Sequence, residues 1–213
     1  MTRKNFWLGF VFFFAPLAVL GQRTNYQSGW NPGVLVLADN SIVKGEINYI
    51  QKKENVIVTS KNKKTTYHAS SIKYFQFYDK KLKYNRAFTA LSRKPDSPPS
   101  KMQVFEIVLE GALPYYRKPV LVEKVVVKRD KAGSSHVMDD FVEYVYFLKT
   151  EDRLIQVKNF GTDVLPHMKK HIREISNFME ENKLNITLVS DQIQIIDKYN
   201  ALEENLATKK GID

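Results

Sequence analysis

Short apolar segments separated by polar turns run from residue 33 to residue 158, and they limit the chain to a β-rich fold. "GVLVLADNSIVKGEINYI", residues 33–50, predicts a strand, a turn at Asp39-Asn40 and a second strand. Asp and Asn tolerate the left-handed backbone that tight hairpin turns need. Similar segments rich in Val, Ile, Thr, Tyr and Phe follow. We therefore expect an α+β, mainly β fold with antiparallel meander or barrel-like sheets and a C-terminal helical segment.

The second half of this β region is less regular. "KMQVFEIVLE", residues 101–110, alternates, which sets Phe105, Ile107 and Leu109 on one face and Glu106 and Glu110 on the other. Residues 92–100 hold three prolines and predict a loop or an internal boundary of the β body. "PVLVEKVVVK", residues 119–128, predicts a strand that begins at its proline, and "RDKAGSSHVMDD", residues 129–140, predicts a polar excursion.

A different period begins after Gly161, where apolar residues recur at steps of three and four. This pattern is typical of an amphipathic helix or a broken helix pair. Thr162 or Asp163 is the expected first cap, and Asp191 with Gln194 resembles a capping box. We expect residues 161–205 to be helical and to pack on the β body at 33–160, and residues 206–213 to fray. The stripe consists of Val164, Leu165, Met168, Ile172, Ile175, Phe178 and Met179, continued by Ile193, Ile196 and Tyr199.

The first residues predict a secretory signal peptide. Arg3 and Lys4 precede an uncharged run at 6–20, and the small Gly21 follows it. That run contains Pro16 and is shorter than the roughly 20 apolar residues of a membrane-spanning helix. We expect residues 1–21 to be removed, residues 22–32 to form a tether, and the mature chain to have no transmembrane span. The predicted location is exported: periplasmic, outer-membrane-associated or secreted.

The composition excludes some chemistry and suggests one class of partner. The chain has no cysteine, so disulfides and thiolate metal sites are impossible, and its formal net charge is +10. A basic surface attracts polyanions, which in an envelope include lipopolysaccharide and acidic glycans. The alternative is that the charge only maintains solubility. The predicted polyanion contacts are the lysines of the β turns: Lys52, Lys53, Lys61, Lys63, Lys64, Lys80, Lys81 and Lys83.

No residue pattern predicts a catalytic, cofactor-binding or metal site. His167 and His171 stand four residues apart, but a zincin-type site needs Glu where Met168 stands, so we expect surface histidines. "SSHVMDD", residues 134–140, gathers Ser, His and Asp in a predicted loop, where triad geometry is rare. The aromatic and basic residues of 73–88 fit a strand pair that buries Phe75 and Phe77, and base or sugar stacking is the alternative.

The order of several motifs resembles a family of uncharacterised exported proteins common in Bacteroidetes-type bacteria. The hairpin from Gly33 to Ile47, the element "IVLEGALPYYRK", the segment "YVYFLKTEDRLIQV" and the pair Tyr199-Asn200 carry the resemblance, which covers most of the chain after residue 21. The chain departs from the family at Asp39-Asn40-Ser41, where glycine is common, and at Pro114. The resemblance implies a signal peptide, a β-rich body and a helical end, and it implies no activity.

Two function classes follow from these features. The first is an exported cell-envelope protein that acts as a non-catalytic binding or structural module, with an envelope polyanion or an envelope protein as partner. The alternative is an exported hydrolase whose catalytic carboxylates meet only in the fold. A deep pocket holding two carboxylates with perturbed pKa values would favour the hydrolase.

We predict export with cleavage after Gly21, because residues 1–21 have the basic, apolar and small-residue order of a signal peptide. Mass spectrometry of the protein from its native cells should find Gln22 at the amino terminus. Retention of residues 1–21 would exclude cleavage.

Overall fold

Ten antiparallel strands form one sheet, which confirms the predicted mainly β fold with a helical C-terminal segment. The computed structural model describes residues 29–92, 101–130, 133–151 and 153–210. The strand order is β10-β9-β8-β7-β6-β5-β1-β2-β3-β4. The predicted signal peptide and tether residues 22–28 lie outside the described residues, as does most of the proline-rich stretch. The sheet continues across that stretch because β6 pairs with β7.

The first seven strands follow the predicted segments to within a few residues. The first strand begins at Asn31, which lies inside the stretch predicted as a tether. The elements are β1 (Asn31–Leu37), β2 (Ile42–Ile50), η1 (Gln51–Lys53), β3 (Asn55–Ser60), β4 (Lys63–His68), η2 (Ala69–Ser71), β5 (Ile72–Asp79), β6 (Tyr84–Ser92) and β7 (Met102–Leu109).

The β1–β2 hairpin turns as predicted. Asn40 adopts a left-handed φ of 66°, and the Asp39 carboxylate accepts the Ser41 backbone N–H at 2.9 Å. Gly33 and Gly45 are cross-strand partners in this hairpin. A Cβ atom at Gly33 would lie 2.3 Å from the Gln76 carbonyl oxygen, so this glycine permits close approach of β5.

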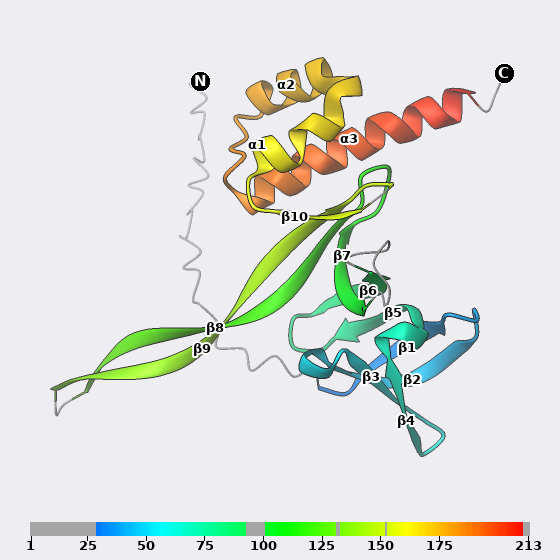
Figure 1. Ribbon diagram of the computed structural model, residues 1–213, viewed down its shortest axis with the longest axis vertical. Coiled ribbons are helices and arrows are strands. Elements are labelled where there is room, and N and C mark those ends of the chain that lie inside the picture. The colour runs from blue at the N-terminus through cyan, green and yellow to red at the C-terminus, as the bar shows by residue number, and fades with distance from the viewer. Residues whose placement is uncertain (1–28, 93–100, 131–132, 152, 211–213) are drawn as a thin grey trace, which may run out of the picture.

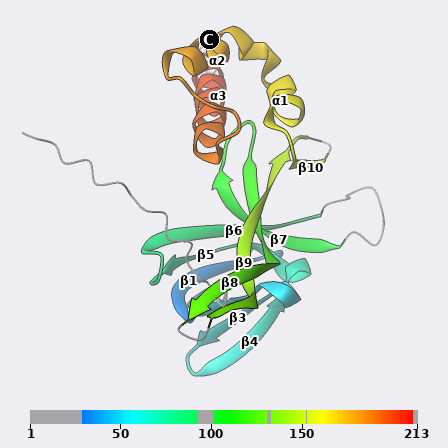
Figure 2. The ribbon, with the colours of Figure 1, turned by 90° about the vertical axis from the view of Figure 1, so that its left-hand side faces the viewer.

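This part of the sheet curves around its own core. Tyr49 of β2 lies 5.5 Å, ring centroid to ring centroid, from Phe88 of β6, although β1 and β5 separate those strands. A flat sheet would place the two strands about 14 Å apart, since neighbouring strands are spaced by about 4.8 Å. The enclosed cluster includes Leu35, Ile47, Val56, Phe75, Phe77 and Val104. Figure 2 shows these strands below the helices.

A long two-stranded ribbon replaces the predicted polar excursion. β8 (Tyr115–Asp130) and β9 (Gly133–Lys149) pair in one continuous register from Tyr115↔Leu148 to Asp130↔Gly133. The excursion predicted at 129–140 is therefore wrong, and so is the strand start predicted at Pro119. The sequence pattern did not predict the far part of this ribbon, because Gly133, Ser134 and Ser135 have low intrinsic strand propensity. Figure 1 shows the far half of the ribbon projecting away from the body.

The helical end covers the other end of the sheet (Figures 1 and 2). After β10 (Leu154–Val157) come α1 (Phe160–Asp163), η3 (Leu165–His171), α2 (Ile172–Glu181) and α3 (Val189–Lys210). A second core joins them to the sheet through Leu113, Tyr115, Leu148, Met168, Ile175 and Ile196. A third, smaller cluster of Phe105, Tyr116 and Phe147 lies on the opposite face of the strands.

The helix boundaries differ from the predicted ones. Asn159, and not Thr162 or Asp163, caps α1 by accepting the Thr162 N–H at 3.2 Å, while Asp163 accepts the N–H groups of Lys158 and Asn159. Asp191 lies inside the first turn of α3, where its carboxylate accepts the Asn185 N–H at 2.8 Å. α3 also includes residues 206–210, which were predicted to fray. None of the helices in the described residues is long and apolar enough to span a membrane.

Asn200 links α3 to the β7–β8 turn. Its Oδ1 accepts the Leu113 N–H at 2.8 Å, and its Nδ2 donates to the Glu110 carbonyl at 3.1 Å. Gly111 has a φ of +132°, and a Cβ atom there would lie 2.6 Å from the Asn200 side chain. Two motifs far apart in the sequence, "LEGALPYY" and Tyr199-Asn200, therefore meet in space.

Replacing Ile175 with Ala should lower the free energy of unfolding by about 2–5 kcal/mol, because its fully buried side chain would leave a cavity. Phe178 is only half-buried, and Lys198 Nζ lies 5.5 Å from its ring centroid. Phe178→Ala should cost less. Urea unfolding of both variants measures the difference, and equal small losses would mean that the helical end is detached from the sheet.

Candidate functional site

The ribbon leaves the sheet at a cluster of buried and half-buried charges, which we call the ribbon root. β8 pairs with β7 only as far as Glu106↔Arg117, and beyond that point it continues with β9 alone. Consecutive residues of a strand point to opposite faces. Arg117 and Lys118 thus place one cation on each face of β8 at the point of departure. The root comprises Asp79, Arg86, Glu106 and Arg117 on one face and Glu54 and Lys118 on the other.

Glu106 is the centre of the first face. Arg86 Nε and Nη2 donate to its two carboxylate oxygens at 2.9 and 2.8 Å. Arg117 Nε and Nη2 donate to the same two oxygens at 2.9 and 2.8 Å. The side chain is 3% exposed, so one buried carboxylate receives two bidentate guanidinium groups from β6 and β8.

Arg86 carries the network into the curved sheet. Its Nη1 lies 3.3 Å from Asp79 Oδ2, and its guanidinium carbon lies 5.0 Å from the Phe88 ring centroid. Asp79 Oδ1 also accepts the backbone N–H groups of Lys81 and Leu82, each at 3.0 Å. The β5–β6 turn is therefore held to the ribbon root. The two arginines and the two carboxylates give this face a formal charge of zero.

The electrostatics keep Glu106 ionised. Burial by itself raises the pKa of its carboxyl group, but hydrogen bonds and charge from Arg117 and Arg86 outweigh burial and lower the pKa. Burial likewise disfavours the charged form of Arg117, yet its bonds to Glu106 raise its pKa overall. Neither group changes charge near neutral pH, so this site is a fixed ion network.

Glu54 closes the opposite face. Its Oε2 accepts the Val104 backbone N–H of β7 at 2.8 Å, and its Oε1 accepts a hydrogen bond from Lys118 Nζ. Gln51 Nε2 donates to the Pro119 carbonyl, and Lys118 Nζ also donates to Gln103 at 3.1 Å. The β2–β3 connection is thereby joined to β7 and to the base of β8.

Aromatic rings complete the exposed side of the root. Tyr84 Oη accepts from Arg117 Nη2 at 2.9 Å, and the Arg117 guanidinium carbon lies 4.4 Å from the Tyr144 ring centroid. Burial raises the pKa of both tyrosines despite the opposing effect of Arg117. Tyr84 and Val120 are each 40% exposed, so the base of the ribbon presents apolar surface beside the buried ions.

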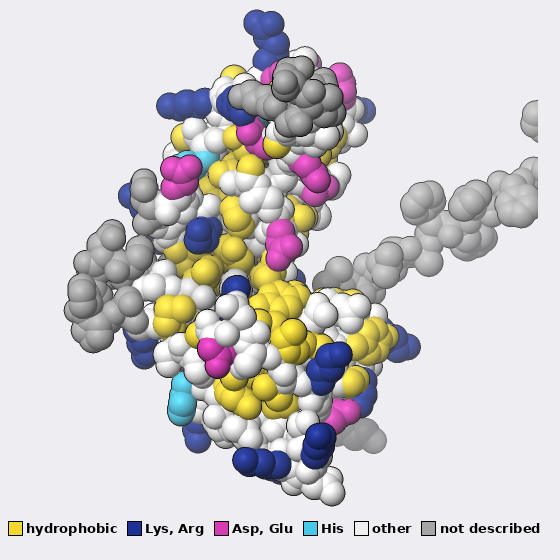
Figure 3. Space-filling model, turned by 90° about the vertical axis from the view of Figure 1, so that its right-hand side faces the viewer, with side chains coloured by type: hydrophobic (Ala, Val, Ile, Leu, Met, Phe, Trp, Pro, Cys, Tyr) yellow, Lys and Arg dark blue, Asp and Glu magenta, His cyan; other side chains and the backbone are white. Residues whose placement is uncertain are grey.

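All eight predicted lysine contacts are exposed, but they do not form one rim. Lys64 Nζ lies 5.1 Å from the Trp30 ring centroid, and Lys80 Nζ lies 3.9 Å from Glu46 Oε2. Lys64 and Glu46 lie on the same face, because the cross-strand pairs Pro32↔Glu46, Glu46↔Thr59 and Thr59↔Lys64 run across β1 to β4. Lys52 and Lys53 lie in η1, beyond the start of β3 at Asn55, which is itself about 13 Å from Thr59 along the strand. Figure 3 shows lysines and arginines distributed around the curved part of the sheet.

The histidine interpretation needs one correction. His171 is buried, with Nε2 2.9 Å from Glu203 Oε1 and its ring edge against Tyr199, whereas a surface position was expected. His167 is half-buried, and His136 lies in the ribbon, where side chains are not described. The described residues contain no group of three or more His, Cys, Asp or Glu arranged for a metal ion. Phe75 and Phe77 are buried, as predicted for the 73–88 pair.

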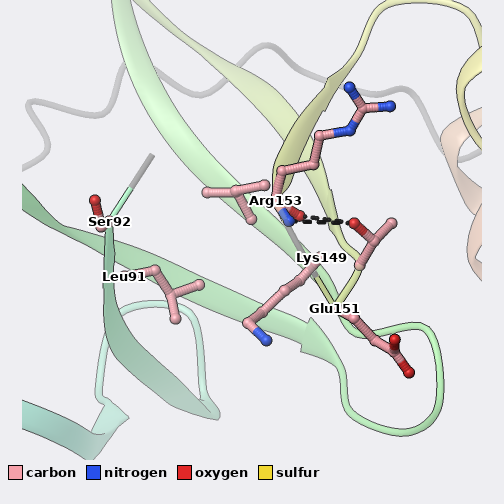
Figure 4. A pocket seen from close by; sticks show the side chains of 7 residues that line it. Leu91, Ser92, Lys149, Glu151 and Arg153 are labelled. Atoms are coloured by element: carbon pink, nitrogen blue, oxygen red, sulfur yellow. Dashed lines mark hydrogen bonds between the residues drawn. The ribbon is translucent and has the colours of Figure 1, made fainter. Parts of the chain in front are cut away.

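Two hollows lie beside the β9–β10 turn. One of about 180 Å³ is lined by Leu91, Ser92, Lys149, Glu151 and Arg153, among others (Figure 4). The Thr150 hydroxyl donates to the Arg153 carbonyl at 3.1 Å, which closes that turn. The second hollow, of about 510 Å³, shares Thr150, Glu151 and Arg153 and adds His167. Each contains one carboxylate, that of Glu151, and it is exposed.

Sequence reasoning missed the ribbon root because its members are far apart in the chain. A weak signal existed, since Arg86 and Glu106 are lone charges within strand-forming runs. No protein-family model, no curated protein and no solved structure matches this chain. The resemblance to exported Bacteroidetes-type proteins thus stays a prediction.

Replacing Glu106 with Gln should lower the free energy of unfolding by about 3–5 kcal/mol, because the buried Arg86 and the half-buried Arg117 lose their shared charge partner. Because the folded pKa of Glu106 is depressed, its contribution is present above the unfolded value of about 4.3 and is lost as the pH falls through the lower folded pKa. Urea unfolding across the acid range should show this component in the parent and not in Glu106→Gln. The exposed Glu110→Gln is the control and should change little.

Lysines on the Trp30 face should determine any polyanion binding. Changing Lys64 and Lys80 to Ser should weaken binding to heparin, an acidic glycan, and make its salt dependence shallower. Thermal stability should hardly change because exposed ion pairs contribute little. Lys52→Ser with Lys53→Ser is the matched control. Equal weakening in both variants would place the contact elsewhere, and no heparin binding by the parent would assign the charge to solubility.

Proposed function

We propose that this chain is an exported, non-catalytic binding module of the cell envelope, and that the β8–β9 ribbon is the element it presents to a partner. One observation carries the proposal. The ribbon continues beyond Arg117 with no third strand among the described residues, while its base is fixed by ion pairs on both faces. A two-stranded ribbon is marginally stable alone, so such an element is expected to act against another surface.

The charge pattern supports binding in preference to hydrolysis. A glycoside hydrolase needs one carboxylic acid with a raised pKa, so that it can donate a proton. Glu106 has a lowered pKa, and both its oxygens already accept bonds from two arginines. Asp79 is committed to Arg86 and to the β5–β6 turn. These carboxylates are structural, which counts against the hydrolase alternative.

Export and envelope location rest on the sequence of residues 1–21 and on the resemblance. The basic face at Lys64 and Lys80 supports a second contact, to an envelope polyanion such as lipopolysaccharide or an acidic glycan. A protein with this arrangement would use charge for initial attraction and the ribbon for specific recognition.

Shortening the ribbon tests this function. Val120 and Glu143 are cross-strand partners, so a two-residue Asn-Gly turn can join them in place of residues 121–142. The shortened chain should fold, because the root and its pairing with β7 are retained. It should lose binding to envelope fractions of the native cells, measured by co-sedimentation.

Asp39→Asn with Asn40→Gly places the same dipeptide in the β1–β2 turn and leaves the ribbon intact. This control should bind as the parent does. Undiminished binding by the shortened chain, or no binding by the parent at any salt concentration, would contradict the proposed function.

A further inference from the structure

One edge of the ribbon has a backbone ready for strand pairing. The Lys149 N–H donates to the Pro114 carbonyl at 3.0 Å, so Pro114 and Lys149 form a hydrogen-bonded pair of the β8–β9 ladder. Such pairs alternate along an antiparallel ladder, and the register is continuous to Asp130. Even-numbered residues of β8 therefore bond to β9, and odd-numbered residues direct N–H and C=O outward.

Two observations at the base agree with this assignment. Gln51 Nε2 donates to the carbonyl of Pro119, an odd-numbered residue, from outside the ribbon. Proline at 119 also costs the ladder no hydrogen bond, because an outward position needs no N–H toward β9. Beyond Pro119 the outward backbone groups belong to residues 121, 123, 125, 127 and 129, and no described strand pairs with them.

We propose that this edge of β8 pairs with the same edge of a second copy of the chain, antiparallel and about a two-fold axis at Val125. The pairing joins two ribbons into a four-stranded sheet. Such a sheet is more stable than a two-stranded ribbon, which is only marginally stable alone. The inference rests on the proposed role of the ribbon as the binding element, and it identifies the partner of one edge.

The sequence along the edge favours β8 over β9 and is compatible with this register. Val125-Val126-Val127 has high strand propensity, whereas β9 carries Gly133, two serines and the adjacent Asp139-Asp140. Residues whose backbone groups point outward must pair with outward residues of the second copy, and on β8 these are the odd-numbered residues. The two-fold axis therefore passes through a residue and not between two residues. Val125 is the centre of the unpaired stretch, so an axis there pairs all five outward residues of 121–129 and sets no like charges directly opposite. An axis at residue 124 or 126 would oppose lysine to lysine, which is unfavourable.

The absence of cysteine from the chain makes a direct test possible. Hydrogen-bonded antiparallel partners have Cα atoms about 5.5 Å apart, within the range that a disulfide spans. Val125→Cys should therefore form a disulfide-linked dimer in air. Val122→Cys is the matched control, because its copy would stand six residues away along the strand, about 20 Å. It should remain largely unlinked.

Light scattering on the mature chain provides the second measurement and should give twice the monomer mass. Val125→Pro should be monomeric with an unchanged far-ultraviolet circular dichroism spectrum, because the N–H it removes is not used by the β8–β9 ladder. A monomeric parent at every concentration overturns the proposal, and so does cross-linking of Val122→Cys as readily as Val125→Cys.

The outcomes separate this inference from the proposed function. A monomeric parent whose shortened variant has lost envelope binding overturns the dimer and leaves the proposed function standing. A dimeric parent whose shortened variant still binds the envelope overturns the proposed function and leaves the dimer standing.

Discussion

The buried carboxylate of Glu106 is the interaction on which the arrangement of this protein depends. It lies on β7, between the curved part of the sheet and the ribbon, and accepts four guanidinium hydrogen bonds from Arg86 and Arg117. The attraction between these charges offsets the cost of burying them only because the geometry is bidentate on both sides. Each arginine then carries the restraint into a neighbouring strand, and Arg86 extends it through Asp79 to the β5–β6 turn.

Alternation predicted the strand at 102–109 and separated Phe105 from Glu106 correctly, but it assigned Glu106 to the polar face of a half-buried strand. Periodicity of two distinguishes the faces and does not show whether both are covered. Here both are, because the sheet curves over one face, while Phe105 packs with Tyr116 and Phe147 on the other. The apolar stripe likewise predicted the helices. It did not predict that Asn159 caps α1, because the choice of capping residue depends on local backbone geometry.

The ribbon and its root were hidden for different reasons. Gly133, Ser134 and Ser135 have low strand propensity. They pair with residues 128–130 because the β8–β9 register that is set at the root continues without a shift to the tip of the ribbon. The root unites Glu54, Asp79, Glu106 and Arg117, which no short sequence window contains. A lone charge in a strand-forming run, as at Arg86, signals a buried partner without identifying it. The signal is general, because unpaired charges are almost never fully buried.

The two faces of the root restrain different motions of the ribbon. Arg117 ties one face of β8 to β7, and Lys118 ties the other to Glu54, which also bonds the free edge of β7 at Val104. Apolar packing could stabilise this junction as well, since buried ion pairs often match hydrophobic replacements in stability. It would leave the direction of the ribbon less defined, because hydrophobic contact is non-directional. Directional bonds on opposite faces of one strand fix both its tilt and its twist, which a projecting element needs in order to meet a partner in a single register.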